Sequence, residues 1–360
     1  MISAHVAAGS QGPYTSESTT MENTEKRRTQ LRRIEESRGS RAIAYITGDR
    51  QGAETKIGMD VFPYFYRVLS KIGRTQKIDV LLYSTGGVTM AAWGLANLIR
   101  EFSDKFSVLV PFKAQSAATL LCLGADEVVM GRLGQLSPVD PSVTSPFNPP
   151  APQNPMQPVP QLLPVSVEDV TSYLSLAREE AELKSEESVL EVFKKLSDTV
   201  QPMALGSVYR AKQQIKLLSQ QLLAFHMDEE KEKSRITNII KWLTRELFSH
   251  DYLIGRREAK NTLKLKVVIP PDELEGGIWE AFSTYAEAID MFAPYNPGIV
   301  LGTTDEKTIQ LDNAFIECTD IGFAFRTEKV VKRVTVSQGP GMPSAVGFQE
   351  QVLNQGWVEI

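Results

Sequence analysis

The sequence contains few of the residues that build metal sites and disulfide frameworks. Among its 360 residues are two cysteines and three histidines. Cys122 lies in an apolar stretch far along the chain from Cys318, so this pair predicts neither a disulfide framework nor a metal centre. We therefore expect a protein that uses no metal and no cofactor.

Excess basic charge and long apolar runs are absent as well. The formal net charge is −5 and the sequence pI is near 5.5, which leaves no basic footprint for nucleic acid. No window approaches the length of a membrane span, and the first twenty residues lack the basic start and apolar run of a signal peptide. These absences predict a cytoplasmic protein with no nucleic-acid partner and no membrane span.

The composition that is present, 42% hydrophobic and 23% charged, suits a soluble chain with a sizeable core. Residues 1–39 are expected to form a disordered tail followed by a charged helix, which would be a solvated or partner-covering arm. Residues 145–164 are rich in proline and predict an extended loop. Helical patterns follow from residue 167 to about residue 250, and residues 269–360 predict a small extension with short strands.

Strand and helix patterns alternate between these regions with short connections. Such alternation is typical of an α/β fold in which βαβ units share a largely parallel sheet. The strands are nearly all apolar, as expected where both faces of a sheet are covered. The strand-like segments are "RAIAYITG" (41–48), "KIDVLLYSTGG" (77–87), "KFSVLVPF" (105–112) and "EVVMG" (127–131).

Two features with chemical potential follow neighbouring strands. Gly86 and Gly87 can adopt positive φ and leave backbone N–H groups bare, although an isolated pair of glycines is more often only a tight turn. One helix and one strand later, Ser116 opens the next helix. Ser116 either caps that helix or acts as a nucleophile. In the second case, the amides of Gly86, Gly87 and Ala117 are the expected donors to the oxyanion and to substrate.

Several motifs together resemble a known family. They are "LLYSTGG", "VPFKAQSAATLLCLGADEVVMGRLGQLSPVDPSV", "ALGSVYRAKQQIKLLSQQLL" (204–223) and "SHDYLIGRREAKNTLKLKV" (249–267). The set resembles the Clp-protease/crotonase fold and, within it, the serine dehydrogenase proteinase family, which is related to signal peptide peptidases. The resemblance implies a peptidase domain of stacked βαβ units over residues 40–268, with a helical insertion, and a C-terminal extension over residues 269–360. It also implies a serine endopeptidase that acts on peptides or proteins and forms a homo-oligomer.

The same resemblance implies a catalytic triad with Ser116 as nucleophile, Asp140 as acid and His250 as base. Imidazole is the natural base near neutral pH. Each assignment has an alternative. Asp140 precedes a proline and would suit a turn, and Asp251 is a second candidate acid. Lys113, three residues before the serine, would replace the histidine in a Ser-Lys dyad.

One departure from the Clp pattern leaves other functions open. The histidine expected there shortly after the nucleophile's helix is missing, and the sequence reads Leu136, Ser137, Pro138. A silent scaffold that keeps the fold for assembly therefore remains an alternative to a peptidase. An acyl-CoA enzyme of crotonase type is disfavoured, because that chemistry usually needs an acidic residue beside the thioester and gains nothing from Ser116.

Overall fold

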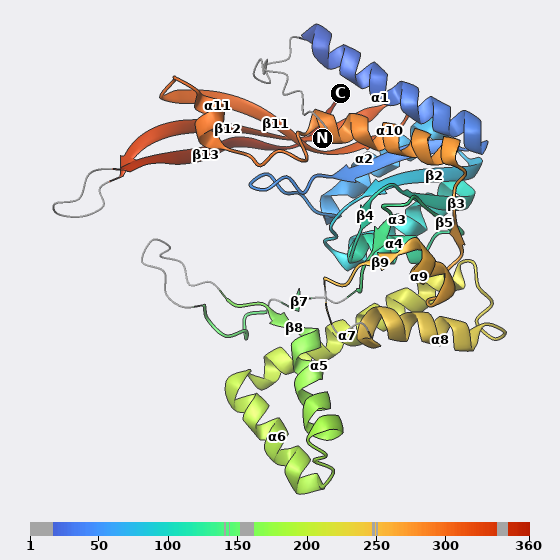
Figure 1. The fold of residues 1–360 in the computed structure, drawn as a ribbon, viewed down its shortest axis with the longest axis vertical. Coiled ribbons are helices and arrows are strands. Elements are labelled where there is room, and N and C mark those ends of the chain that lie inside the picture. Colours follow the sequence, from blue (N-terminus) through green and yellow to red (C-terminus); the bar gives the residue numbers. More distant parts are fainter. Residues whose placement is uncertain are drawn as a thin grey trace, which may run out of the picture.

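The computed structural model of the chain describes residues 17–139, 142–143, 145–151, 162–246, 249, 251–336 and 345–360. Its centre is an eight-stranded mixed sheet with helices on both faces (Figure 1). The strand order is β10-β5-β3-β2-β1-β11-β12-β13, in which β10 to β1 are parallel and the last three are antiparallel. The parallel strands are β1 (Arg41–Thr47), β2 (Thr75–Tyr83), β3 (Ser103–Val110), β5 (Glu127–Met130) and β10 (Val267–Val268).

The alternation of strands and helices predicted from the sequence is confirmed in this parallel part. Its strands are buried on both faces, as Ile43 and Ala44 of β1 illustrate with no exposed area. This is why they read as continuous apolar runs. The connecting helices are η1 (Met59–Val61), α2 (Phe62–Ile72), α3 (Thr89–Phe102) and α4 (Ala117–Leu123).

Alternate residues of the strands feed two separate cores. Val80 and Val108 face α2, α3, α4, α7 (Pro202–Ala224) and α8 (Lys233–Lys241). Leu81 and Leu109 face α1 (Glu17–Arg38) and α10 (Asp272–Ala288), which lie side by side on the opposite face (Figure 1). The protein is thus a three-layer α/β structure, because the period-two alternation of a strand delivers one core to each face.

The C-terminal region differs from the short strands expected there. The strands β11 (Glu306–Glu317), β12 (Gly322–Val336) and β13 (Ala345–Glu359) are 12, 15 and 15 residues long. β11 pairs with β1, so these strands continue the central sheet and then project from it as a ribbon (Figure 1). The short helix α11 (Pro297–Leu301) packs on this ribbon.

Other elements form smaller additions to the body. The helical pattern from residue 167 is interrupted by a π-helical turn, η2 (Leu176–Glu180), between α5 (Val167–Ser175) and α6 (Glu186–Thr199). These helices project away from the sheet (Figure 1). A second π-helical turn, η3 (Trp242–Glu246), follows α8. The remaining elements are β4 (Lys113–Ala114), β6 (Gln135–Leu136), β7 (Ser142–Val143), β8 (Val165–Ser166), β9 (Ile254–Gly255) and α9 (Arg256–Asn261).

Helix α1 packs on the body of its own chain, whereas its charges suggested a solvated or partner-covering arm. Leu31 and Ile34 are buried against α10 and the sheet. Arg27 and Arg28 reach the fully buried carboxylate of Glu317 at the end of β11, with Nε to carboxylate oxygen distances of 2.8 and 3.2 Å. The two arginines and the spacing of two apolar residues therefore fix the helix, although its composition is that of a solvated one.

Arg27→Ala should destabilise the fold strongly. The substitution leaves the Glu317 carboxylate buried with one of its two guanidinium partners removed, and the loss of one member of a buried ion pair costs about 3–5 kcal/mol. Chemical denaturation measures the change in unfolding free energy. Arg32→Ala is the matched control on the same helix, because Arg32 pairs with Glu25 at the surface, and it should leave the unfolding midpoint unchanged. Equal midpoints for the two variants would contradict the buried role of Arg27.

Candidate active site

The segments that follow β2 and β3 run side by side. Ser84 forms a parallel bridge with Ala114, in which the Ser84 N–H donates to Lys113 O at 2.9 Å and the Gln115 N–H donates to Ser84 O at 3.0 Å. The carboxyl ends of parallel strands meet at one edge of a sheet, where α/β proteins place their sites. The glycines after Ser84 and the serine after Gln115 are therefore brought together as neighbours.

Ser116 has the backbone conformation of a residue held under strain. Its φ is 52° and its ψ is −116°, a left-handed region that side chains other than glycine rarely adopt. It immediately precedes α4, but its side chain makes no capping bond to the helix. Within the described part of the chain, its hydroxyl has no hydrogen-bond partner. The capping interpretation is therefore wrong, and the Ser116 hydroxyl is unbonded among the described residues, on a sharp turn between strand and helix.

A buried hydroxyl holds the amide of Ser116. The Ser116 N–H donates to Ser137 Oγ at 2.8 Å. Ser137 is itself fixed, because its N–H donates to Thr119 Oγ1 at 3.0 Å and its hydroxyl donates to Pro138 O at 3.0 Å. Ser137 and Thr119 are buried. Ser137 thus occupies the position where a Clp-type histidine was expected. Its hydroxyl holds the Ser116 amide, a role that the sequence did not reveal.

Gly86 supplies the space that Ser116 occupies. A Cβ at position 86 would lie 2.7 Å from Ser116 Cβ and 3.1 Å from Ser116 Oγ, and the φ of Gly86 is 110°. Gly87 is equally confined, because a Cβ there would lie 2.2 Å from Ile57 O. Both glycines are required by contact and by backbone conformation together, so the pair is more than the relief of an ordinary turn.

The backbone amides around Ser116 fall into two groups. The Gly86 N–H donates to Ser84 Oγ at 3.0 Å, and Thr47 donates its hydroxyl to the same oxygen at 2.8 Å. Gly86 is therefore not a free donor. The N–H groups of Gly87 and Ala117 have no acceptor among the residues that the structure describes. Two of the three expected oxyanion donors are thus unengaged among the described residues. Ala117 follows Ser116 directly, and Gly87 follows the glycine that contacts Ser116. We call the backbone turn at Ser116 the serine turn.

Lys113 is committed to an acidic partner. Its ammonium lies 2.6 Å from Asp49 Oδ2, and Tyr83 donates its hydroxyl to Asp49 Oδ1 at 2.8 Å. Burial, together with the charge of Asp49, raises the pKa of Tyr83 far above its ordinary value. The structure describes no contact between Lys113 and Ser116. Asp49 and Thr47 escaped the sequence analysis, although polar residues directly after a buried strand are a usable signal.

The remaining candidates are less directly placed. His250 and Asp140 lie outside the described residues. Asp251 is exposed, and its backbone N–H donates to Ser249 Oγ at 3.2 Å. The imidazole of His226 is engaged elsewhere, because its Nε2 lies 2.9 Å from Leu123 O, and burial lowers its pKa.

Described residues close in sequence to Asp140 and His250 make contacts near Ser116. β6 pairs with β4, just before Ser116, and with β9, so Leu136 faces Ile254. Val139, directly before residue 140, donates its N–H to Leu243 O at 2.9 Å. The described residues Ser137 and Ile254 thus both belong to segments that pair beside Ser116.

Neither Cys122 nor a metal-binding cluster provides an alternative site among the described residues. Cys122 lies inside α4 and is 2% exposed, and burial raises the pKa of its thiol far above the ordinary range. No group of three or more His, Cys, Asp or Glu side chains that could hold a metal occurs in the ranges described. In the same ranges, no helix is long and apolar enough to cross a membrane.

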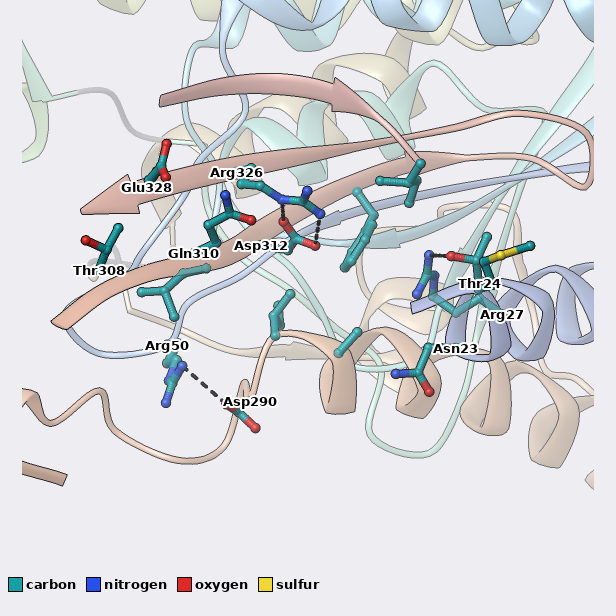
Figure 2. A pocket seen from close by; sticks show the side chains of 16 residues that line it. Asn23, Thr24, Arg27, Arg50, Asp290, Thr308, Gln310, Asp312, Arg326 and Glu328 are labelled. Atoms are coloured by element: carbon teal, nitrogen blue, oxygen red, sulfur yellow. Dashed lines mark hydrogen bonds and ion pairs between the residues drawn. The ribbon is translucent and has the colours of Figure 1, made fainter. Parts of the chain in front are cut away.

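A cavity of about 770 Å³ lies apart from these residues, between α1, the end of α10 and the ribbon strands (Figure 2). Its charged groups are largely satisfied within the chain. Arg326 makes a bidentate pair with Asp312 at 2.7 and 2.9 Å, and Arg50 lies 3.5 Å from Asp290. Ser116 is not among its lining residues, so the candidate active site is the serine turn.

Comparison with known proteins identifies relatives and a family for this chain. Two uncharacterized proteins of Methanocaldococcus jannaschii are 31% and 28% identical to this chain, each over 121 residues. The matched stretch covers 31% of this chain and 41% and 42% of the relatives, so the chain spans less than half the length of either. No solved structure matches the chain significantly. Residues 14–206, more than half of the sequence, match the model of a protein family. This chain belongs to the ClpP-like SDH-type serine proteinases.

Proposed function

We propose that this chain is a serine endopeptidase in which Ser116 is the nucleophile, His250 the base and Asp140 the acid. The amides of Gly87 and Ala117 form the oxyanion hole. The observation that carries the proposal is the strained backbone of Ser116, φ 52°, with its hydroxyl unbonded among the described residues. Strain of this kind persists only where the surroundings enforce it, and it is concentrated at functional sites.

The chain geometry allows both partners to reach the serine. Ser137, which accepts the Ser116 N–H, lies three residues before Asp140, a chain span of at most about 11 Å. Ile254, which pairs with Leu136, lies four residues after His250, a span of at most about 14 Å. Lys113 is a poorer base because its ammonium pairs with a carboxylate. These contacts support the triad over the Ser-Lys dyad.

The proposed reaction has two halves, acylation of Ser116 and hydrolysis of the acyl-enzyme, and the same groups act in both. His250 accepts the Ser116 proton while Ser116 Oγ attacks the substrate carbonyl, and the resulting oxyanion accepts hydrogen bonds from the N–H groups of Gly87 and Ala117. Asp140 orients the imidazole and stabilises its protonated form. The imidazolium then protonates the leaving amine. In the second half, the same base deprotonates a water molecule, which attacks the acyl carbonyl. The bond from the acyl carbon to Ser116 Oγ then breaks, and the imidazolium returns a proton to Ser116 Oγ.

The proposal extends to substrate and fold. We assign residues 40–268 to a peptidase domain with the Clp/crotonase-like arrangement of βαβ units, and residues 269–360 to an extension that lengthens its sheet. The substrate is a peptide or protein in extended form, which would add as a strand beside residues 84–87 at Gly87, whose N–H has no acceptor among the described residues. The neighbouring N–H groups are engaged within the chain: Ser84 donates to Lys113 O at 2.9 Å, and Val88 donates to Ile57 O at 2.8 Å.

Ser116 should be essential for activity and costly for stability. Ser116→Ala and Ser116→Gly should both lower peptide hydrolysis by about six orders of magnitude, because each removes the attacking atom. Ser116→Gly should nevertheless unfold with a free energy about 1 kcal/mol higher than Ser116→Ala, since glycine alone relieves the left-handed strain. Hydrolysis assays and denaturant titrations measure the two effects. Retained turnover in either variant would refute the nucleophile, and a more stable alanine variant would refute the strain.

Gly86→Ala should disable the serine without removing it. The new methyl group would lie 2.7 Å from Ser116 Cβ, so the serine turn must shift, and labelling by a fluorophosphonate should slow at least about a hundredfold. Gly39→Ala is the matched control. Gly39 also has positive φ, 58°, but a Cβ there meets nothing within 4 Å. That variant should label at the wild-type rate, and equal labelling of Gly86→Ala and wild type would contradict the contact.

The identity of the base can be tested by substitution and pH. His250→Ala should lower turnover about as much as loss of the nucleophile, whereas Lys113→Ala should retain most of it. In the wild type, turnover should rise with pH through one ionisation near about 6.5, because only neutral imidazole accepts the serine proton. The Ser-Lys dyad would be established instead if Lys113→Ala were inactive and His250→Ala active, and if wild-type turnover rose only at a pH well above neutrality. Asp140→Asn and Asp251→Asn, compared in the same assay, identify the acid.

A further inference from the structure

Strand β13 (Ala345–Glu359) is an open edge of the central sheet. It is 15 residues long, and among the described strands β12 alone pairs with it. It runs along the outside of the ribbon that projects from the body (Figure 1). A long edge of this kind presents unpaired N–H and C=O groups to any strand of matching direction.

The backbone groups that face outward can be assigned. The Ile360 N–H donates to Gly322 O at 3.0 Å, which makes this pair a hydrogen-bonded one. Hydrogen-bonded and non-hydrogen-bonded pairs alternate along antiparallel strands, so Trp357 and Glu359 turn their amides and carbonyls away from β12. A bulge between the partners of Glu328 and Lys329 shifts the register by one residue. Beyond it, the outward positions are Val346, Phe348, Glu350 and Val352.

This edge lacks the devices that usually protect one. The sequence of β13, AVGFQEQVLNQGWVE, contains no lysine, arginine or proline. Its two glutamates are neutralised within the chain, Glu350 by Lys329 and Glu359 by Arg67, each at 2.5 Å. Apolar side chains are exposed instead: Val346, Phe348, Val352 and Leu353 are 64%, 41%, 55% and 53% exposed. The strand is therefore both open and apolar.

The strand also matches itself. Two copies of β13 can be aligned antiparallel about a two-fold axis, so that residue 352 of one copy lies opposite residue 353 of the other. The first half of each strand then lies along the second half of its partner. Phe348 then falls beside the Gly356–Trp357 stretch of the other copy, and neither glutamate faces an acidic residue. Aromatic residues next to glycines and the absence of opposed like charges favour cross-strand pairing.

We propose that β13 pairs with β13 of a second copy of this chain, which joins the two eight-stranded sheets into one continuous sheet. The contact is isologous, as expected for a two-fold dimer. It leaves the serine turn untouched, so it does not depend on the peptidase assignment. The self-match about residues 352 and 353 favours a second copy over an unrelated extended peptide.

A charge placed on the axis tests the proposal. In sedimentation at micromolar concentration, the wild type should have twice the 40.0 kDa monomer mass. Val352→Lys should have the monomer mass, because two lysines would meet across the axis. Val352→Glu should do the same, and an equimolar mixture of the two variants should restore the dimer. Leu190→Lys, an equal change at an exposed position of α6, should remain dimeric.

A disulfide provides a second, independent readout. Cys122 and Cys318 are both buried, so a thiol introduced at position 352 would be the exposed one among the described residues. Val352→Cys should cross-link to its own copy under mild oxidation, and Leu217→Cys, at an exposed position of α7, should not. A monomeric wild type, or a dimer that survives Val352→Lys and leaves Val352→Cys unlinked, would overturn the proposal. A synthetic β13 peptide should bind the wild type more tightly than it binds Val352→Lys. Equal affinity for the two proteins would likewise overturn the proposal.

Discussion

The close approach of Gly86 and Ser116 is the contact on which the candidate site depends. With 2.7 Å from a Cβ at position 86 to Ser116 Cβ, the two segments touch without room for one further carbon atom. Ser137 holds the opposite side of the turn through the Ser116 amide. Ser116 lies between Gly86, which has no side chain, and the buried hydroxyl of Ser137, so tertiary packing imposes its left-handed backbone. A serine free of these contacts would prefer a negative φ.

The sheet explains why two such segments can be held together. β2 and β3 are parallel neighbours, so the chain leaves both at the same edge, and the bridge between Ser84 and Ala114 carries their pairing past the ends of the strands. Ser84 connects this edge to β1 through Thr47 and fixes Gly86 through its amide. A chain of hydroxyl and backbone hydrogen bonds thus extends the rigidity of the sheet into the loops that form the candidate active site.

Sequence reasoning succeeded where the signal is local. The apolar strands, the helices between them and the serine turn all follow from residues close in sequence, and the family resemblance is confirmed by the match over residues 14–206. It failed where partners are distant. The docking of α1 depends on Glu317, about 290 residues from Arg27, and the role of Ser137 depends on the pairing of β6 with β4. No local pattern reports such contacts, because a charged helix looks solvated until its buried counter-charge is known.

The arrangement around Lys113 limits how the serine can be activated. A lysine is a general base only as the neutral amine, since an ammonium has three donors and no acceptor. Lys113 Nζ lies 2.6 Å from Asp49 Oδ2, so its donors are directed at a carboxylate, and no described contact joins it to Ser116. Among the described neighbours of Ser116, Ser137 holds the serine amide, the N–H groups of Gly87 and Ala117 have no acceptor, and Lys113 is directed at Asp49. The proposed base, His250, precedes β9 in the sequence, and β9 pairs with β6, which pairs in turn with β4 directly before the serine.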